Sequence, residues 1–188
     1  MKKALTAKPA KPAKSNLKKI AKGIKLLILD VDGVMTDGGI IMDGEGNELK
    51  KFHVRDGHGI KLLLASGVQV ALITGRRSEV VERRAKDLGI TEVYQRCHIK
   101  SAAYEHLLEK LSVRDSETAY IGDDIVDIPV FKRAGLPVAV ADASEEAKSF
   151  ALMVTGARGG RGAVRELAEF ILKAKGLWDG IVEEHSKV

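Results

Sequence analysis

The stretch that organises this chain reads Ile24-Lys-Leu-Leu-Ile-Leu-Asp30-Val-Asp32-Gly33-Val-Met-Thr-Asp37. Its first half is a short apolar run, which predicts a buried strand. Asp30 and Asp32 then stand where this strand ends and a glycine-bearing loop begins. In open parallel α/β sheets, ligands bind just beyond the carboxyl ends of the strands. The stretch therefore predicts both a central strand and a site at its end.

Two carboxylates separated by one residue can take different roles in one reaction. Asp30 can act as a nucleophile while Asp32 transfers protons. Because ionised carboxylates at this distance repel each other, we also expect a bound cation. The alternative is a polar turn in which an aspartate makes an Asx turn or caps a helix.

The composition indicates one domain with an aliphatic core. The chain has 188 residues, of which 45% are hydrophobic and only 4% aromatic. The formal net charge of +5 comes from residues 1–25, which hold nine of the 31 basic residues and no acidic one. The remaining 22 basic residues face 26 acidic ones, a balance of −4. This mild acidity argues against a nucleic-acid-binding surface.

The N-terminal segment, residues 1–22, contains a Lys/Pro/Ala repeat over residues 8–14. Such a composition cannot form a packed core, so we expect a disordered tail. It lacks the apolar core of a secretory signal, and no run of about 20 apolar residues predicts a membrane span. Cys97 is the only cysteine, which excludes an internal disulfide and fits a reducing cytoplasm. A packed or surface thiol is the favoured role for it over a catalytic one.

Strand and helix patterns alternate along the rest of the chain, which predicts a parallel sheet with helices on both faces. The expected strands are residues 25–30, 68–74, 92–95, 118–122 and 137–140. The expected helices are residues 59–65, 79–88, 101–111, 125–134, 145–152 and 163–174.

One segment, residues 39–54, interrupts this alternation. Residues 39–42 and 48–54 flank a Gly/Asn-rich loop, the pattern of a β-hairpin. A lone two-stranded hairpin is marginal in water. Its apolar residues therefore need a partner surface, either on their own domain or, as we prefer, on another subunit. These residues are Ile40, Ile41, Leu49, Phe52 and Val54.

Polar residues also follow three further expected strands. Thr74 and Gly75 offer a hydroxyl and backbone N–H groups to an anion, although a simple Thr-Gly turn explains them equally well. Lys100 opens a helix, a position where a surface lysine is common. The run Gly122-Asp-Asp-Ile-Val-Asp127 brings three carboxylates, which suit Mg²⁺. Helix capping explains one of them well and all three poorly.

Taken together, these motifs resemble the haloacid dehalogenase superfamily of phosphohydrolases, over about residues 24–172. The resemblance implies a Rossmann-like sheet with an inserted hairpin in place of a cap domain. It implies that Asp30 is a nucleophile forming an aspartyl-phosphate and that Asp32 is the general acid/base. Mg²⁺ would be held by Asp30, the Asp32 carbonyl and Asp123. Further roles are implied for phosphoryl-binding Thr74 and Lys100, and for Asp124 and Asp127 as metal-site support.

A narrower resemblance is to the capless 3-deoxy-D-manno-octulosonate 8-phosphate (KDO 8-phosphate) phosphatases. It rests on residues 30–38, 56–60, 81–86 and 159–166. It implies hydrolysis of a sugar phosphate in lipopolysaccharide precursor synthesis, a cytoplasmic homotetramer joined by its hairpins, and C-terminal tails that reach neighbouring sites. The expected organisation is a tail over residues 1–22, a phosphatase domain over 23–175 and a C-terminal tail over 176–188. The Lys-rich extension is longer than this family leads us to expect.

Substrate recognition is the least specified part of the sequence. The sugar carboxylate needs a cationic partner, for which Arg76 is the first candidate and a surface arginine the alternative. His58 could reach substrate hydroxyls or simply fill a loop, and His53 is expected to be structural. Residues 156–162 could form a hinge that closes over the site or a plain linker, and Trp178 could anchor the tail.

Three rival functions remain. The first is a phosphatase for another acidic sugar phosphate, such as one of the nine-carbon sialic-acid type. The second is a non-catalytic phospho-acceptor module, which would not need Asp32. The third is a structural interaction protein built on the hairpin, which leaves the polar residues at the strand ends unexplained.

Overall fold

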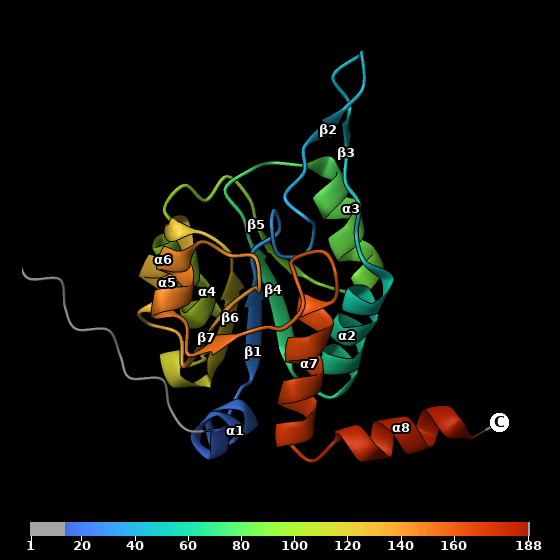
Figure 1. Ribbon diagram of the computed structural model, residues 1–188, viewed down its shortest axis with the longest axis vertical. Helices are drawn as coiled ribbons and strands as arrows, with labels where there is room; N and C mark the ends of the chain where they lie inside the picture. The colour runs from blue at the N-terminus through green and yellow to red at the C-terminus, as the bar shows by residue number, and fades with distance from the viewer. Residues whose placement is uncertain (1–13, 188) are drawn as a thin grey trace, which may run out of the picture.

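A six-stranded parallel sheet forms the centre of the molecule (Figure 1). The computed structural model describes residues 14–187. The strand order is β5-β4-β1-β6-β7-β8, with β1 paired to both β4 and β6. All four residues of β1 are buried, as the apolar run predicts. The strands are β1 Leu26–Leu29, β4 Gln69–Ile73, β5 Glu92–Tyr94, β6 Thr118–Gly122, β7 Leu136–Ala139 and β8 Met153–Val154.

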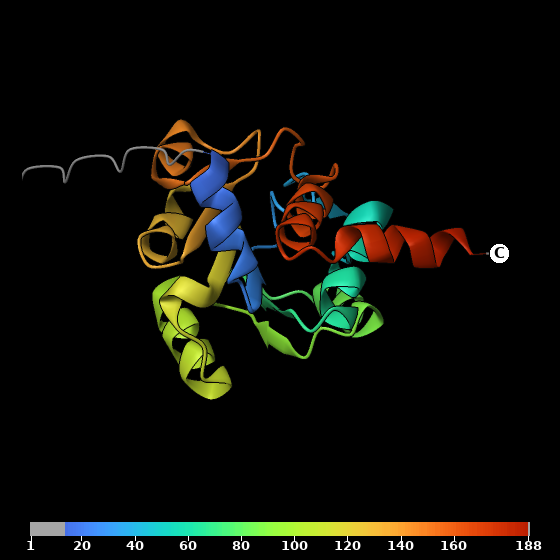
Figure 2. The same ribbon diagram turned by 90° about the horizontal axis from the view of Figure 1, so that it is seen from below.

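Helices cover both faces of this sheet (Figures 1 and 2). One face carries α2 (Val54–Ala65), α3 (Glu79–Leu88) and α7 (Ala163–Ala174). The other carries α4 (Lys100–Leu111), α5 (Ile128–Phe131) and α6 (Glu145–Phe150), with 3₁₀ turns at Asp115–Glu117 and Ile125–Asp127. The α/β class with a doubly covered parallel sheet is therefore confirmed.

Helix α2 begins five residues earlier than we expected. Gly57, which we took to precede the helix, and Gly59, which we took to begin it, both lie inside it. Glycine lowers helix propensity, but here it permits close packing. A Cβ atom on Gly59 would lie 3.1 Å from the Cβ of Ala168 in α7, and one on Gly57 would lie 2.3 Å from Arg84. Tertiary packing of α2 against α7 and α3 thus overrides the local preference.

The last expected helix before α7 was too long. It spans Glu145–Phe150 rather than residues 145–152, and the chain then forms β8 at the sheet edge. A strand of two residues carries too little periodicity to be recognised in the sequence.

The N-terminal tail is shorter than expected because residues 14–22 form a helix, α1 (Lys14–Lys22). The expectation of disorder is therefore wrong for these residues, and residues 1–13 lie outside the described part of the chain. Ala21 is fully buried, and Leu17 and Ile20 pack against the core. An apolar stripe at helical spacing lies within the lysine-rich segment, after the last proline of the repeat.

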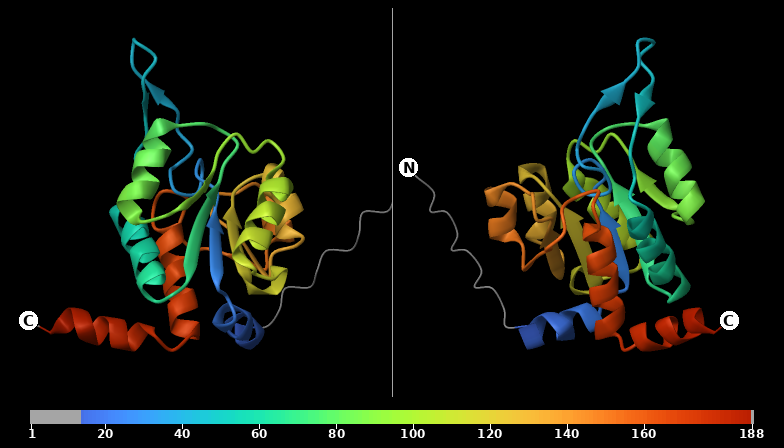
Figure 3. Two further views of the ribbon diagram at one scale, coloured as in Figure 1. Left: turned by 180° about the vertical axis from the view of Figure 1, so that it is seen from behind. Right: turned by 45° about the vertical axis from the view of Figure 1, so that its right-hand side comes forward.

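The inserted segment is a hairpin of β2 (Ile41–Met42) and β3 (Glu48–Leu49), shorter than expected, with Ile41 paired to Leu49. It projects from the end of the sheet where β1 terminates (Figures 1 and 3). Phe52 at its base packs against its own domain beneath Arg84. The other apolar residues are solvent-exposed in this chain: Ile40 58%, Ile41 50%, Met42 60%, Leu49 57% and Val54 82%.

The chain ends in α8 (Trp178–Ser186), which leaves the body at the opposite end of the sheet from the hairpin (Figures 1 and 3). Its Trp178 ring lies under the cationic groups of Arg165 and Lys173, at 5.2 and 5.1 Å from the ring centroid. Within residues 14–187, no helix combines the length and apolar character needed to cross a membrane.

Candidate active site

The polar residues singled out in the sequence meet at the carboxyl ends of β1, β4 and β6. Because the three strands are parallel and adjacent, Asp30, Thr74 and Asp123 follow them at the same edge of the sheet. A pocket of about 220 Å³ opens there. It is lined by Asp30, Asp32, Thr74, Gly75, Arg76, Cys97, His98, Lys100 and Val126.

Lys100 is the buried cation of this pocket. Its side chain is only 3% exposed, and its Nζ atom lies 3.0 Å from Asp30 Oδ2 and 2.6 Å from Asp127 Oδ1. Burial lowers the pKa of this lysine, but the carboxylates of Asp30 and Asp127 outweigh that effect and hold it above its ordinary value. Lys100 is therefore charged and fixed in place.

Asp127 is the anchor of this arrangement. It is fully buried, and both of its oxygens accept two hydrogen bonds. Tyr120 Oη donates to Oδ1 at 2.6 Å, beside the Lys100 bond. The N–H groups of Asp123 and Asp124 donate to Oδ2 at 2.9 and 3.2 Å. With its acceptors occupied in this way, Asp127 supports the site from behind.

Asp30 and Asp123 are the carboxylates that remain for a cation. Oxygens of Asp30, Asp123 and Asp127 lie within 4.8 Å of one another. Burial, reinforced by Asp127, raises the pKa of Asp30 to about 6 even though Lys100 opposes the shift. Burial and the neighbouring Asp30 and Asp127 raise the pKa of Asp123 to about 7. An acidic cluster of hard oxygen ligands with this mutual repulsion fits Mg²⁺.

The loop after β1 is shaped to leave room for Asp123. Gly33 adopts a φ of 86°, and a Cβ atom there would lie 2.1 Å from Asp123 Oδ2. A larger residue at this position would displace the carboxylate. The glycine of the opening stretch is thus required both by backbone conformation and by contact with the metal-site candidate.

Asp124 has a different place from its neighbours. It is exposed, and its side chain accepts from the N–H of Ile125 at 2.8 Å, capping the short 3₁₀ turn. Asp124 and Asp127 cap this turn reciprocally: the Asp124 N–H donates to Asp127 Oδ2, and the Asp124 side chain accepts from the Asp127 backbone. Its contribution to the site is therefore the geometry of this turn.

Asp32 is joined to the hairpin, a link that our reading of the sequence missed. Lys50 donates a hydrogen bond to Asp32 Oδ1 and lies 3.2 Å from Glu48 Oε1. Arg76 lies 3.9 Å from Asp32 Oδ2 through Nε and 3.3 Å from Glu48 Oε1 through Nη2. Glu48 and Lys50 flank exposed Leu49 at alternate positions, so their side chains share one face of the expected strand. This polar face is the feature of the sequence that could have indicated the link.

Thr74 and its neighbours form the far wall of the pocket. Thr74 is 2% exposed, its N–H donates to Tyr94 O at 2.9 Å, and its carbonyl accepts from Cys97 N at 3.0 Å. Burial raises the pKa of the Cys97 thiol despite nearby Lys100, so this cysteine is not an activated nucleophile. Arg76 keeps 47% of its side chain exposed at the pocket rim.

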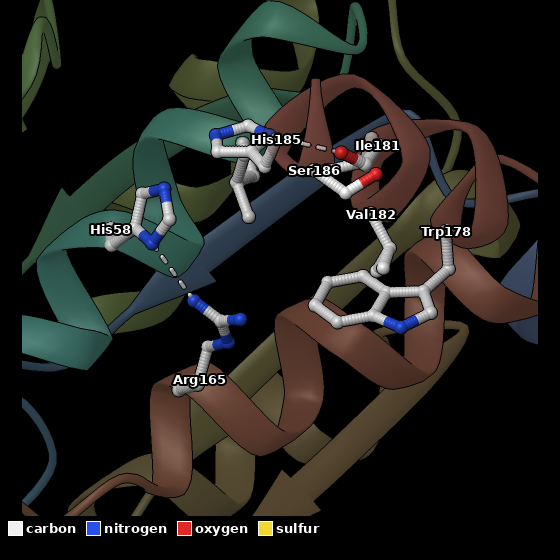
Figure 4. Close-up of a pocket in the computed structure, with 8 residues that line it drawn as sticks. His58, Arg165, Trp178, Ile181, Val182, His185 and Ser186 are labelled. Carbon is white, nitrogen blue, oxygen red and sulfur yellow. Dashed lines mark hydrogen bonds between the residues drawn. The ribbon is translucent and has the colours of Figure 1, made fainter. Parts of the chain in front are cut away.

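His58 is not brought into this pocket within the described chain. It lies on α2 and lines a separate pocket of about 330 Å³ between α2, α7 and α8 (Figure 4). Arg165 Nη1 lies 3.1 Å from its Nδ1, and the ring of His185 on α8 is 5.7 Å away, centroid to centroid. Burial, Arg165 and His185 lower the pKa of His58. His53 precedes α2, with Nδ1 3.7 Å from Asp56.

The glycine-rich segment 156–162 packs on the loop that follows Asp30. Gly160 N donates to Val34 O at 2.8 Å, and a Cβ atom on Gly159 would lie 1.8 Å from Gly33 O. Asp56 accepts from the N–H groups of Gly162 and Arg165 at 3.2 and 2.8 Å, which ties the start of α2 to the start of α7. In this chain the segment serves as a tightly packed support for the loop.

Comparison with known proteins places this geometry in context. A family model described as haloacid dehalogenase-like hydrolase matches residues 87–167. The 3-deoxy-D-manno-octulosonate 8-phosphate phosphatase of Escherichia coli (strain K12) is 51% identical over 159 residues, which is 85% of each chain. Its counterpart from Yersinia pestis is 51% identical over 160 residues, covering 85% of this chain and 86% of the relative.

Solved structures give the same result. The crystal structure of the Yersinia pestis phosphatase superposes with a TM-score of 0.87 at 50% identity, covering 88% of this chain and 89% of that one. The phosphatase of Moraxella catarrhalis, solved in complex with magnesium ion, phosphate ion and KDO, has a TM-score of 0.91 at 41% identity. It is matched over its full length, and 93% of this chain is covered.

Proposed function

Since this chain belongs to the haloacid dehalogenase-like hydrolases and, within them, to the family of 3-deoxy-D-manno-octulosonate 8-phosphate phosphatases, we propose that it hydrolyses KDO 8-phosphate to KDO and inorganic phosphate. The observation that carries the proposal is the pocket in which Asp30, Asp32, Thr74 and Lys100 converge beside Asp123. The Moraxella catarrhalis relative, solved with magnesium, phosphate and KDO together, supports the same substrate and cofactor.

In this proposal Asp30 is the nucleophile. A carboxylate oxygen of Asp30 attacks phosphorus, an aspartyl-phosphate forms, and the bond from phosphorus to the sugar oxygen breaks. Lys100, 3.0 Å from Asp30, neutralises charge on the transferring phosphoryl group, and Thr74 supplies a neutral donor. Phosphoryl transfer depends mainly on such positioning and charge stabilisation.

Asp32 moves the protons in both halves of the reaction. It gives a proton to the departing sugar oxygen, then takes one from the water that attacks the aspartyl-phosphate. Water oxygen bonds to phosphorus, the bond to Asp30 breaks, and inorganic phosphate leaves with both side chains restored. Its place in the pocket, two residues from Asp30, supports this division of roles.

Mg²⁺ is the cofactor of this proposed reaction, and Asp30 and Asp123 are the side chains that fit it. The ion would supply positive charge that offsets the phosphoryl oxygens and the crowded carboxylates. The backbone carbonyl of Asp32 would be a further protein ligand. Asp127 accepts hydrogen bonds from Lys100 and from the turn after β6, and so fixes the positions of both.

The sugar carboxylate is assigned to Arg76, whose half-exposed guanidinium lies at the pocket rim. His58 remains a weaker candidate, because it lies in the pocket between α2, α7 and α8. A nine-carbon acidic sugar phosphate is the second candidate substrate, since a site without a cap leaves the far end of the sugar unconstrained in this chain.

We further propose that the enzyme is a cytoplasmic homotetramer in lipopolysaccharide precursor synthesis. Four exposed apolar side chains of the hairpin, each at least 50% exposed, supply the surface for assembly. They are Ile40, Ile41, Met42 and Leu49.

The test is phosphate release from a panel of sugar phosphates with and without Mg²⁺. We expect KDO 8-phosphate to have the highest kcat/KM and chelation to abolish turnover. A sialic-acid-type 9-phosphate that exceeds KDO 8-phosphate would favour the second candidate. Phosphate release that survives exhaustive chelation would rule out the metal-dependent reaction.

A further inference from the structure

Lys50 has a buried side chain on a hairpin whose apolar residues Ile40, Ile41, Met42 and Leu49 are exposed. Its side chain is 1% exposed, although its neighbour Leu49 is 57% exposed. Burying an ammonium group and its flexible chain is unfavourable unless strong contacts compensate. Those contacts are the hydrogen bond to Asp32 Oδ1 and the ion pair with Glu48 at 3.2 Å. The hairpin therefore places the ammonium group of Lys50 against the loop that follows β1.

The contacts close into a ring of two cations and two carboxylates. Glu48 Oε1 lies 3.2 Å from Lys50 and 3.3 Å from Arg76 Nη2, and Arg76 Nε lies 3.9 Å from Asp32 Oδ2. With Asp32 and Glu48 both ionised, the formal charges of this ring sum to zero. It can therefore lie beside the carboxylates of Asp30 and Asp123 without adding to their mutual repulsion.

We infer that Lys50 is a positioning residue, which holds the Asp32 carboxylate in the orientation for proton transfer and couples the hairpin to the proposed reaction. The inference rests on the proposed function only through the role of Asp32. Asp32 lies on a loop with its side chain 24% exposed, so its χ angles need an external constraint. Lys50 fixes Oδ1 and leaves Oδ2 for the proton, because Arg76 is only within ion-pair range of Oδ2. Precise orientation of a catalytic group is worth large factors in rate.

Leaving-group chemistry separates this role from a purely structural one. An alkyl phosphate needs a proton on its departing oxygen, whereas p-nitrophenolate departs without one. We expect Lys50→Met to lower kcat/KM for KDO 8-phosphate by at least about tenfold more than for p-nitrophenyl phosphate, because general acid catalysis contributes roughly 10²–10⁴-fold. Lys50→Arg keeps the charge and should lose less. Lys51→Met, on the exposed neighbour, is the matched control.

A double-mutant cycle tests whether Lys50 acts through Asp32. Asp32→Asn alone should show the same selective loss, and adding Lys50→Met to it should change the ratio between the two substrates no further. Light scattering and a thermal melt of each variant report assembly and folding separately from activity.

Three outcomes would overturn the inference. They are equal losses of kcat/KM for both phosphates in Lys50→Met, additive effects in the cycle, and a Lys50→Arg variant that loses as much as Lys50→Met while still folded. Should the wild-type enzyme reject KDO 8-phosphate, the proposed substrate is wrong. The comparison then uses phenyl and p-nitrophenyl phosphates, which also differ in their need for an acid, and still decides the role of Lys50.

Discussion

The Nζ atom of Lys100 lies between two carboxylates, 3.0 Å from Asp30 and 2.6 Å from Asp127. Asp30 faces the pocket, while Asp127 lies behind it with every oxygen hydrogen-bonded. One lysine thus links the proposed reacting group to the structural base of the site. The consequences of this pairing can be measured separately for stability and for turnover.

Lys100→Met should reduce both the stability of the protein and its turnover. Removal of one partner leaves Asp127 uncompensated in the interior, so we expect the free energy of unfolding to fall by about 3 kcal/mol. Phosphate release should fall by roughly 10²–10³-fold, as with loss of other groups that stabilise transition-state charge. Lys110→Met is the control on the same helix, since its pair with Glu92 is 52% exposed on the lysine side and should contribute little to stability. Urea unfolding and steady-state kinetics decide the point, and equal behaviour of the two variants would contradict it.

Asp30→Asn should abolish turnover and leave the fold intact. The amide is nearly isosteric but cannot form the aspartyl-phosphate, so we expect a loss of at least about a thousandfold. Exposed Asp37→Asn, on the same loop, should retain activity. Circular dichroism confirms folding, and mass spectrometry of acid-quenched turnover should detect a phosphorylated wild-type peptide around residue 30. A folded Asp30→Asn protein with substantial activity would remove Asp30 from the mechanism.

Asp123→Asn should stabilise the metal-free protein in a pH-dependent way. The folded-state pKa values of Asp30 and Asp123, about 6 and about 7, exceed the ordinary value of 3.8. The native state therefore binds protons more tightly than the unfolded state, and these groups lose their contribution to stability as pH rises from about 4 to 7. The Tm advantage of the variant over wild type should grow between pH 4.5 and pH 7.5 in the absence of metal.

Mg²⁺ should reverse the order of the two Tm values, so that wild type becomes more stable than Asp123→Asn. Metal binding requires ionised carboxylates, so Mg²⁺ should raise the Tm of wild type strongly at pH 7.5 and weakly at pH 5, and that of Asp123→Asn little at either. Asp87→Asn on the exposed side of α3 controls for the loss of one negative charge. A Mg²⁺-induced shift of the same size in Asp123→Asn and wild type would exclude Asp123 as a ligand.

The hairpin should control assembly. Replacing Ile41 and Leu49 by serine removes a cross-strand apolar pair that is exposed in the single chain. We expect multi-angle light scattering to show a tetramer for wild type and a smaller species for the double variant. Val182→Ser, an exposed apolar residue on α8, should leave the mass unchanged. A wild-type monomer with full activity would rule out both the proposed assembly and an active site shared between subunits.

The tail, residues 176–188, should affect turnover only through a neighbouring subunit. Helix α8 lies at the opposite end of the sheet from the pocket, so it does not cover the site of its own chain (Figures 1 and 3). Deletion of residues 176–188 should change KM and kcat together, as with other lid segments, without changing the assembly. Trp178→Ala retains the tail but removes the contacts between the Trp178 ring and the cationic groups of Arg165 and Lys173. Unchanged constants after deletion would leave the tail without a catalytic role.

The sequence by itself determined the order of strands β1 to β7 and helices α2 to α7, and the residues at the carboxyl ends of β1, β4 and β6. It could do so because burial imposes a regular apolar pattern, and because parallel strands place their ends at one edge of the sheet. The local signals were weaker at Gly57 and Gly59, where packing of α2 against α3 and α7 outweighs the low helix propensity of glycine. They were also weak in α1, whose short apolar stripe is diluted by lysines.

Only the tertiary structure decided which polar residues meet. Spacing along the chain does not show that Asp127 accepts hydrogen bonds from Lys100 and Tyr120, or that Lys50 of the hairpin reaches Asp32. It also does not show that His58 lies beside Arg165 and His185 in a different pocket. Such contacts join segments distant in sequence, and their energies depend on burial and on the direction of each side chain. Those two quantities exist only once the chain is folded, because local sequence fixes neither of them.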